Sequence, residues 1–192
     1  MAATPSTMLA LGTKAPAFDL PDYLGNIHSF QLGEGQNPLL IAFICNHCPF
    51  VVHIMPQFAA LARDCASRGI RVIAISSNDV EHYPQDAPDK MQNFAQAYQL
   101  DIPYLYDETQ EIAKAYHAAC TPDFYLFNAN HELVYRGQFD DSRPGNTTPV
   151  TGKDLARAID VLMNEGSIIT TQKPSIGCNI KWKPGNAPHY YG

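Results

Sequence analysis

The sequence predicts an α/β protein built on a central mixed β-sheet flanked by helices. Two apolar runs, residues 39–44 and 70–75, are continuous enough to be strands buried on both faces, and a helical pattern separates them. A strand, a helix and a second strand at this spacing form a right-handed parallel unit. Two later runs, residues 124–127 and 133–137, are joined by a short turn and predict an antiparallel hairpin. Parallel and antiparallel neighbours together make the sheet mixed.

Length, composition and charge favour one domain that binds neither nucleic acid nor membrane. The chain has 192 residues, 45% of them hydrophobic, which is enough for one well-filled domain with extensions. Its formal net charge is −6, and no cluster of Lys and Arg supplies the basic face that nucleic acids or anionic membranes require. No signal peptide or transmembrane run is present, so we expect a cytoplasmic protein. We expect a flexible arm (1–13), a domain (14–165) and a C-terminal extension (166–192) docked on that domain.

Ahead of the central strand, the sequence predicts a small N-terminal hairpin. Residues 14–21 form one extended segment, and the turn at residues 24–28 leads into a second. Beyond the central strand, Pro49 opens a helix, where its missing N–H costs nothing, and Gly69 ends it. The apolar positions of this helix recur at helical spacing: Val51, Val52, Met55, Phe58, Leu61 and Ala62.

The second half of the chain adds an inserted helix, a further strand and two more helices. A polar loop over residues 76–86 is expected to shape substrate access, and Pro88 opens the inserted helix. Residues 102–106 predict a short strand, after which Asp107 caps a short helix. The final helix has an apolar face of Leu155, Ala158, Ile159, Leu162 and Met163.

The C-terminal segment, residues 166–192, shows no periodicity. Its isoleucines and Trp182 are too apolar for a solvated arm. Prolines, among them Pro174 and Pro184, interrupt it and exclude one long helix or a central strand. We therefore expect a non-regular segment that wraps over the domain in extended form, with Ile180 and Trp182 as anchors.

Two cysteines spaced by two residues, Cys45 and Cys48, lie between the central strand and the helix that Pro49 begins. Unpaired N–H groups and the positive end of the helix dipole favour a thiolate there. We therefore expect a lowered pKa for Cys45, which should attack the substrate, while Cys48 resolves the resulting mixed disulfide. His47 adds positive charge beside the pair. Cys45, His47 and Cys48 are thus the predicted catalytic residues.

Other interpretations of the cysteine pair remain open at this point. Two cysteines at this spacing also occur in zinc sites and structural disulfides. A second hypothesis is a soft-metal carrier that binds copper through Cys45, Cys48 and a histidine such as His53. A third is a redox-inactive interaction domain. The order of strand, cysteine pair, proline and helix favours redox chemistry.

The order of elements, with the cysteine pair at the start of the first helix and Thr121–Pro122 before the hairpin, resembles the thioredoxin fold over residues 14–165. The stretch Cys45–Val51 and the ending Lys173–Trp182 are similar to a peroxiredoxin-like group of the alkyl hydroperoxide reductase/thiol-specific antioxidant (AhpC/TSA) superfamily. The resemblance implies a thiol–disulfide oxidoreductase that acts on a protein or small-molecule disulfide, takes electrons from a thiol donor and needs no cofactor or metal.

The same resemblance implies roles for other residues. The Thr121–Pro122 bond matches a cis peptide that faces the dithiol, where the backbone of Thr121 would bind an extended substrate as an added strand. Cys48 matches the peroxidatic position of peroxiredoxins, which makes a thiol peroxidase the alternative activity, whereas Cys45 in place of their threonine departs from the peroxidase pattern. Cys120 and Cys178 are either packing residues or additional redox cysteines.

Overall fold

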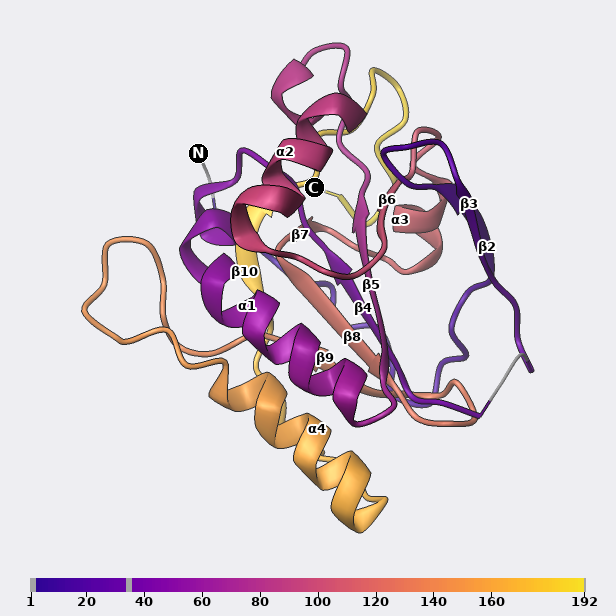
Figure 1. Cartoon of the computed structure of the whole chain (residues 1–192), viewed down its shortest axis with the longest axis vertical. Helices are drawn as coiled ribbons and strands as arrows, with labels where there is room; N and C mark the ends of the chain where they lie inside the picture. The colour runs from indigo at the N-terminus through magenta and orange to yellow at the C-terminus, as the bar shows by residue number, and fades with distance from the viewer. Residues whose placement is uncertain (1–2, 34–35, 192) are drawn as a thin grey trace.

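A computed structural model describes residues 3–33 and 36–191. Its centre is a five-stranded sheet with the strand order β6-β5-β4-β8-β9 (Figure 1). The strands are β4 (Leu39–Phe43), β5 (Arg71–Ser76), β6 (Tyr104–Tyr106), β8 (Asp123–Phe127) and β9 (Leu133–Gly137). β4 pairs parallel with β5 and antiparallel with β8, so the predicted mixed sheet is confirmed.

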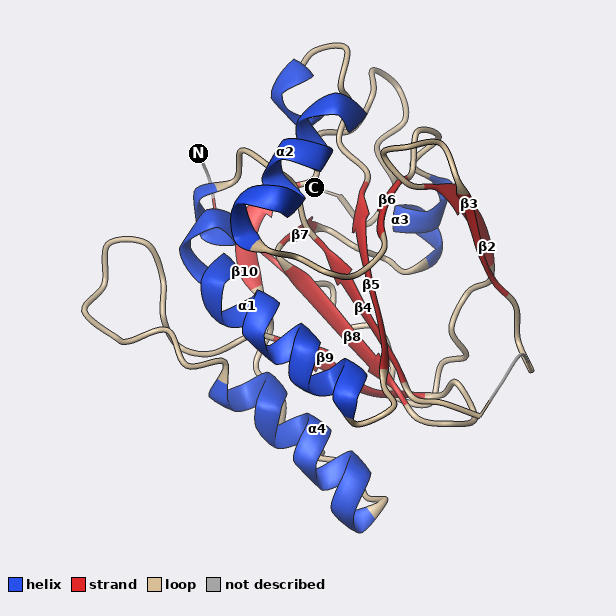
Figure 2. Ribbon diagram, viewed as in Figure 1, coloured by secondary structure: helices blue, strands red, loops and turns tan. Residues whose placement is uncertain are grey.

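Two layers cover the two faces of this sheet (Figure 2). On one face lie α1 (Pro49–Ser67), α2 (Pro88–Tyr98) and α4 (Lys153–Glu165); on the other lie α3 (Glu111–Ala115) and the hairpin of β2 (Phe18–Pro21) and β3 (Ile27–Phe30). Along β4, Leu40 and Ala42 pack into the first layer, while Leu39, Ile41 and Phe43 pack into the second. Side chains alternate between faces, and both faces are buried, which explains the unbroken apolar run.

Helix α1 carries the cysteine pair at its N-terminal end. Pro49 is its first residue and Cys48 is the N-cap, while Gly69, with φ of +77°, follows its C-terminal end as expected. The buried positions form one stripe against the sheet: Val51, Ile54, Met55, Phe58, Ala59, Ala62 and Cys65. The sheet and this stripe together fix where the cysteine pair sits.

The structure corrects the flexible arm expected at the N-terminus. Strand β1 (Ala3–Pro5) pairs antiparallel with β10 (Ile176–Asn179), and the Ser6 N–H donates to the Ser175 carbonyl at 2.8 Å. Further on, the Gly12 N–H donates to the Leu133 carbonyl. The outer edge of β10 and the carbonyl of Leu133 in β9 supply the hydrogen-bonding partners that the sequence could not reveal. Residues 1–2 lie outside the described residues.

The C-terminal segment also departs from the expected non-regular course. β10 is the middle strand of a three-stranded sheet, because it pairs with β1 on one side and with β7 (Cys120–Thr121) on the other. Pro174 and Pro184 lie outside the strand, so they take no N–H away from either ladder. Ile180 is 1% exposed and Trp182 is half-buried against the second layer. Among the described helices, none is long and apolar enough to cross a membrane.

Candidate active site

Strand β4 and helix α1 hold the two cysteines at the edge of the sheet. The Ile44 N–H still donates to the Ile75 carbonyl at 3.0 Å, so the ladder continues to the residue before Cys45. Cys48 occupies the N-cap of α1. Cys45 is 1% exposed and Cys48 is fully buried. The dithiol therefore lies beneath the surface of the folded protein.

Thr121 lies against both cysteines. Its peptide bond to Pro122 is cis, and its Oγ1 is 3.4 Å from the Cys45 Sγ. The Cys48 thiol donates to the Thr121 carbonyl oxygen at 3.2 Å. The structure thus brings together four residues singled out from the sequence, although it tests none of their roles.

The strand edge at Thr121 is already occupied by the chain itself. β10 pairs antiparallel with β7, with Cys178 opposite Thr121 and Asn179 opposite Cys120. In the view of Figure 1, β10 runs beside the N-terminal half of α1. An extended substrate was expected to add a strand at Thr121, but the C-terminal segment takes that place. Any substrate that uses this edge has to displace β10.

A third thiol reaches the dithiol from β10. Residues directly opposite each other in an antiparallel pair project on the same face, so Cys178 shares a face with Thr121. Cys178 is 2% exposed and belongs to the same buried cluster as Cys45 and Cys48. All three thiols therefore belong to one buried cluster beside Thr121.

The three thiols hold their protons unequally. Hydrogen bonds from Cys178 and Cys45 lower the pKa of Cys48, whereas a hydrogen bond to Cys48, burial and the Asp86 carboxylate raise the pKa of Cys45. This corrects the expected low pKa of Cys45. The physical reason is position: Cys48 is the N-cap residue and accepts from its neighbours, while Cys45 precedes the helix and lies near a buried carboxylate.

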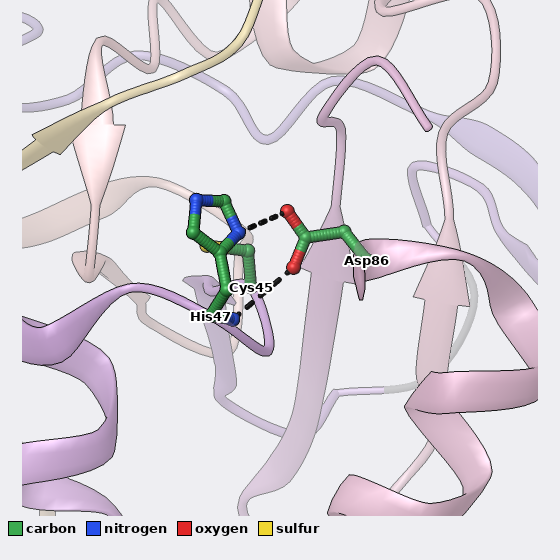
Figure 3. A group of neighbouring side chains, drawn as sticks. All are labelled: Cys45, His47 and Asp86. Carbon is green, nitrogen blue, oxygen red and sulfur yellow. Dashed lines mark hydrogen bonds and ion pairs between the residues drawn. The ribbon is translucent and has the colours of Figure 1, made fainter. Parts of the chain in front are cut away.

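That carboxylate, Asp86, organises the turn between the cysteines (Figure 3). One of its oxygens accepts the backbone N–H groups of Asn46 and His47 at 2.8 and 3.2 Å. The other accepts His47 Nδ1 at 2.6 Å and Asn78 Nδ2 at 2.8 Å. Asp86 has no exposed surface, so its charge acts at short range in a poorly hydrated site.

Sequence analysis missed Asp86 as a functional residue. It precedes Pro88 by two positions, which is typical of a helix start, and in the structure it ends a short 3₁₀ turn (Pro84–Asp86). Yet α2 has Ala87 as its N-cap without any side-chain cap. The carboxylate instead accepts hydrogen bonds from the turn between the two cysteines. Local sequence patterns do not encode such a contact between distant segments.

The C-terminal segment and the loop after β5 close the site on its outer side. The Lys181 N–H donates to Asn78 Oδ1, and the Asp79 N–H donates to the Lys181 carbonyl, both at 2.8 Å. The Tyr83 ring stacks on His47 at 5.9 Å and lies 5.6 Å from the Lys181 ammonium. His47, with a side chain 20% exposed, is partly accessible from outside.

Cys45, His47 and Asp86 could also serve as metal ligands, since one ligand atom from each lies within 4.8 Å of the others. However, His47 Nδ1 is already hydrogen-bonded to Asp86, and a metal on these atoms would have to replace that bond. His53, the ligand considered from the sequence, is bonded through Nε2 to Ser142 Oγ at 2.8 Å. The arrangement fits proton handling beside a thiol better than a metal centre.

The other two cysteines occupy different surroundings. The Cys120 thiol is hydrogen-bonded to the Pro122 carbonyl, and as the neighbour of Thr121 in β7 it projects to the opposite face. Cys65 packs on the buried stripe of α1, and burial raises its pKa to about 11. Neither position offers the low-pKa environment of the N-cap.

The sequence model of the AhpC/TSA family matches residues 11–136 of this chain. The chain belongs to that family. It is a thioredoxin-like thiol redox protein. Two solved structures are similar to it over nearly the whole length. A crystal structure of an uncharacterised conserved protein from Geobacillus kaustophilus has 50% identity and a TM-score of 0.91, with 96% of this chain and 98% of that chain covered. A hypothetical protein from Sinorhizobium meliloti has 48% identity and a TM-score of 0.91, with 95% and 100% covered.

Curated relatives of this AhpC/TSA protein are more distant. A peroxiredoxin candidate of Mycobacterium tuberculosis is 30% identical over 115 residues, which cover 60% of this chain and 68% of the relative. The thiol-disulfide oxidoreductase ResA of Geobacillus kaustophilus is 25% identical over 130 residues, 68% of this chain and 70% of the relative. Both relatives point to thiol redox chemistry, and they differ in the reaction that their names describe.

Proposed function

We propose that this protein is a thiol–disulfide oxidoreductase that works through the Cys45–Cys48 pair. The observation that carries the proposal is the placement of two buried thiols at the N-terminus of α1, both in contact with Thr121 of a cis-proline segment. Such a pair can hold either two protons or one disulfide with little movement of the backbone. The substrate is a small-molecule or protein disulfide, and a thiol donor returns the pair to the reduced form.

Cys45 is the attacking thiol in this proposal. Cys45 is followed by the turn that carries the partly exposed His47, whereas Cys48 is the N-cap of α1, and both cysteines are buried. Because the pKa of Cys48 is lowered and that of Cys45 is raised, the Cys48 thiolate is the base that takes the proton of Cys45 during the reaction and so leaves a thiolate on Cys45. That thiolate attacks the substrate disulfide, one half leaves as a thiolate, and Cys48 then attacks the Cys45 sulfur and releases the other half.

The test compares single cysteine variants in the reduction of glutathione disulfide and of an aromatic disulfide. Cys45→Ser should lower the rate at least about 100-fold, whereas Cys48→Ser should accumulate a mixed disulfide on Cys45 that mass spectrometry detects. Cys65→Ser, a buried cysteine of the same helix, is the control and should keep the wild-type rate. A mixed disulfide trapped on Cys48 in the Cys45→Ser protein would reverse the two roles.

A thiol peroxidase is the second candidate, because the pKa of Cys48 is lowered by hydrogen bonds from Cys178 and Cys45 and Cys48 occupies the helix N-cap. In that reaction the Cys48 thiolate attacks a peroxide, an alcohol or water leaves, and Cys48 becomes a sulfenic acid. A neighbouring thiol then forms a disulfide and releases water. Peroxide consumption with dimedone labelling of Cys48 would favour this activity over disulfide exchange.

A further inference from the structure

We propose that Cys178 is a third catalytic cysteine, which takes over the disulfide from Cys45 by attacking Cys48. This inference rests on the proposed dithiol function and extends it, because it gives the oxidised protein two interchangeable disulfides, Cys45–Cys48 and Cys48–Cys178. The first observation behind it is geometric: Cys178 lies in the same buried cluster as Cys45 and Cys48 and stands opposite Thr121, which contacts both of them.

The backbone holds Cys178 in that place. β10 is paired on both edges, and Cys178 stands opposite Thr121, whose carbonyl oxygen accepts the Cys48 thiol at 3.2 Å. Gly177 permits the close approach of β10, because a Cβ there would meet the carbonyl group of Thr121 and the nitrogen of Pro122. A cysteine held in register beside a resolving cysteine differs from a lone buried thiol, since its reaction partner is fixed.

A second set of contacts anchors the same segment from the other side. The backbone of Lys181 exchanges hydrogen bonds with Asn78 and Asp79, and Asn78 also donates to Asp86 beside Cys45. The segment that carries Cys178 is therefore bonded into the active site at both β7 and the loop after β5. These two sets of hydrogen bonds fix the position of Cys178 relative to the dithiol.

The exchange balances without an added oxidant. The Cys178 thiolate attacks the Cys48 sulfur of the Cys45–Cys48 disulfide, the bond between Cys48 and Cys178 forms, and the bond between Cys45 and Cys48 breaks. Cys45 leaves as a thiolate and takes up the proton that Cys178 released. One disulfide and one thiol are present before and after the step, so the oxidation level of the protein is unchanged.

The electrostatics favour Cys178 as a nucleophile only after Cys48 has been oxidised. In the reduced protein, the hydrogen bond to Cys48 and burial raise the pKa of Cys178, while the Lys181 ammonium opposes this. Once Cys48 is part of a disulfide, it has no thiolate to accept the Cys178 proton. Lys181 remains, and the Cys178 thiolate becomes easier to form.

The test identifies the disulfides formed by the full-length protein after equilibration with oxidised glutathione. Free thiols are blocked with N-ethylmaleimide, and the non-reduced digest is analysed by mass spectrometry. We expect linked Cys45–Cys48 and Cys48–Cys178 peptides in the wild type, only the second in Cys45→Ser, and loss of the second in Cys178→Ser. Cys65→Ser is the control and should match the wild type.

The outcomes separate the inference from the proposed function. If Cys45→Ser leaves Cys48 and Cys178 unlinked, either free or each capped by glutathione, while the wild type forms Cys45–Cys48, the inference fails and the proposed function stands. If the wild type forms no Cys45–Cys48 disulfide, the proposed function itself fails. Cys45→Ala is a second version of the key variant, and circular dichroism verifies that both are folded.

Discussion

Gly177 is the residue on which the position of β10 most directly depends. A Cβ at this position would meet the carbonyl oxygen of Thr121 and would lie 2.6 Å from its carbonyl carbon and 3.1 Å from the nitrogen of Pro122. Non-bonded carbon atoms rest about 3.5–4.0 Å apart, so Gly177→Ala requires a relative shift of about 1 Å between β10 and the cis-proline segment. All three contacted atoms belong to the backbone and cannot rotate away.

The cost can be estimated from overpacked protein interiors, where an extra carbon destabilises the folded state by about 1–3 kcal/mol. For a chain of 192 residues, each kcal/mol lowers the melting temperature by about 2–4 °C, so Gly177→Ala should lower it by roughly 2–12 °C. The shift should also open the pairing of β10 with β7. Cys48 and Cys178 should then react faster with alkylating agents.

Calorimetry and the rate of thiol alkylation measure these two effects. Gly185→Ala is the matched control: its φ of +73° makes alanine unfavourable by about 1–2 kcal/mol, yet a Cβ there meets nothing within 4 Å. The control should lose some stability while its thiols stay protected. If the Gly177→Ala protein has the melting temperature and the alkylation rates of the wild type, the argument that β10 needs glycine at this contact is refuted.

Two further predictions concern buried carboxyl groups. Burial raises the pKa of Asp123 to about 7, so between about pH 4 and pH 7 the folded state keeps a proton that the unfolded chain releases. Stability should fall as pH rises through this window, and denaturant titrations should show a flatter profile for Asp123→Asn; an equally steep fall in the variant would contradict this. Because the Asp86 charge contributes to the raised pKa of Cys45, Asp86→Asn should move the Cys45 alkylation profile to lower pH, and an unmoved profile would exclude that contribution.

The part of the site that sequence analysis could predict is the part built by neighbouring residues. A buried strand, two cysteines and a proline that starts a helix are contiguous, so their geometry follows from helix and strand rules alone. The cis bond at Thr121–Pro122 followed from a resemblance rather than from the residues themselves. These elements define where a dithiol sits and which segment faces it.

The parts that could not be predicted depend on contacts between distant segments. β10 has only four residues, and no pattern within them states that Thr121 is their partner. The low pKa expected for Cys45 was wrong because the hydrogen bond to Cys48, burial and the Asp86 carboxylate all raise it, whereas the sequence showed only the helix terminus. Electrostatics in a buried site is set by all elements that surround it.

The charges around the thiols give the proposed exchange a direction. The Asp86 carboxylate lies near Cys45 and raises its pKa, after the larger effects of the Cys48 hydrogen bond and burial, whereas the Lys181 ammonium lies near Cys178 and acts to lower its pKa. In the proposed exchange, these two charges therefore favour a thiolate at Cys178 over a thiolate at Cys45. Raising the pH favours the form whose free thiol ionises more readily, which is the one with the Cys45–Cys48 disulfide. Lowering the pH removes that preference. The position of the disulfide therefore responds to pH because of the charges of Asp86 and Lys181.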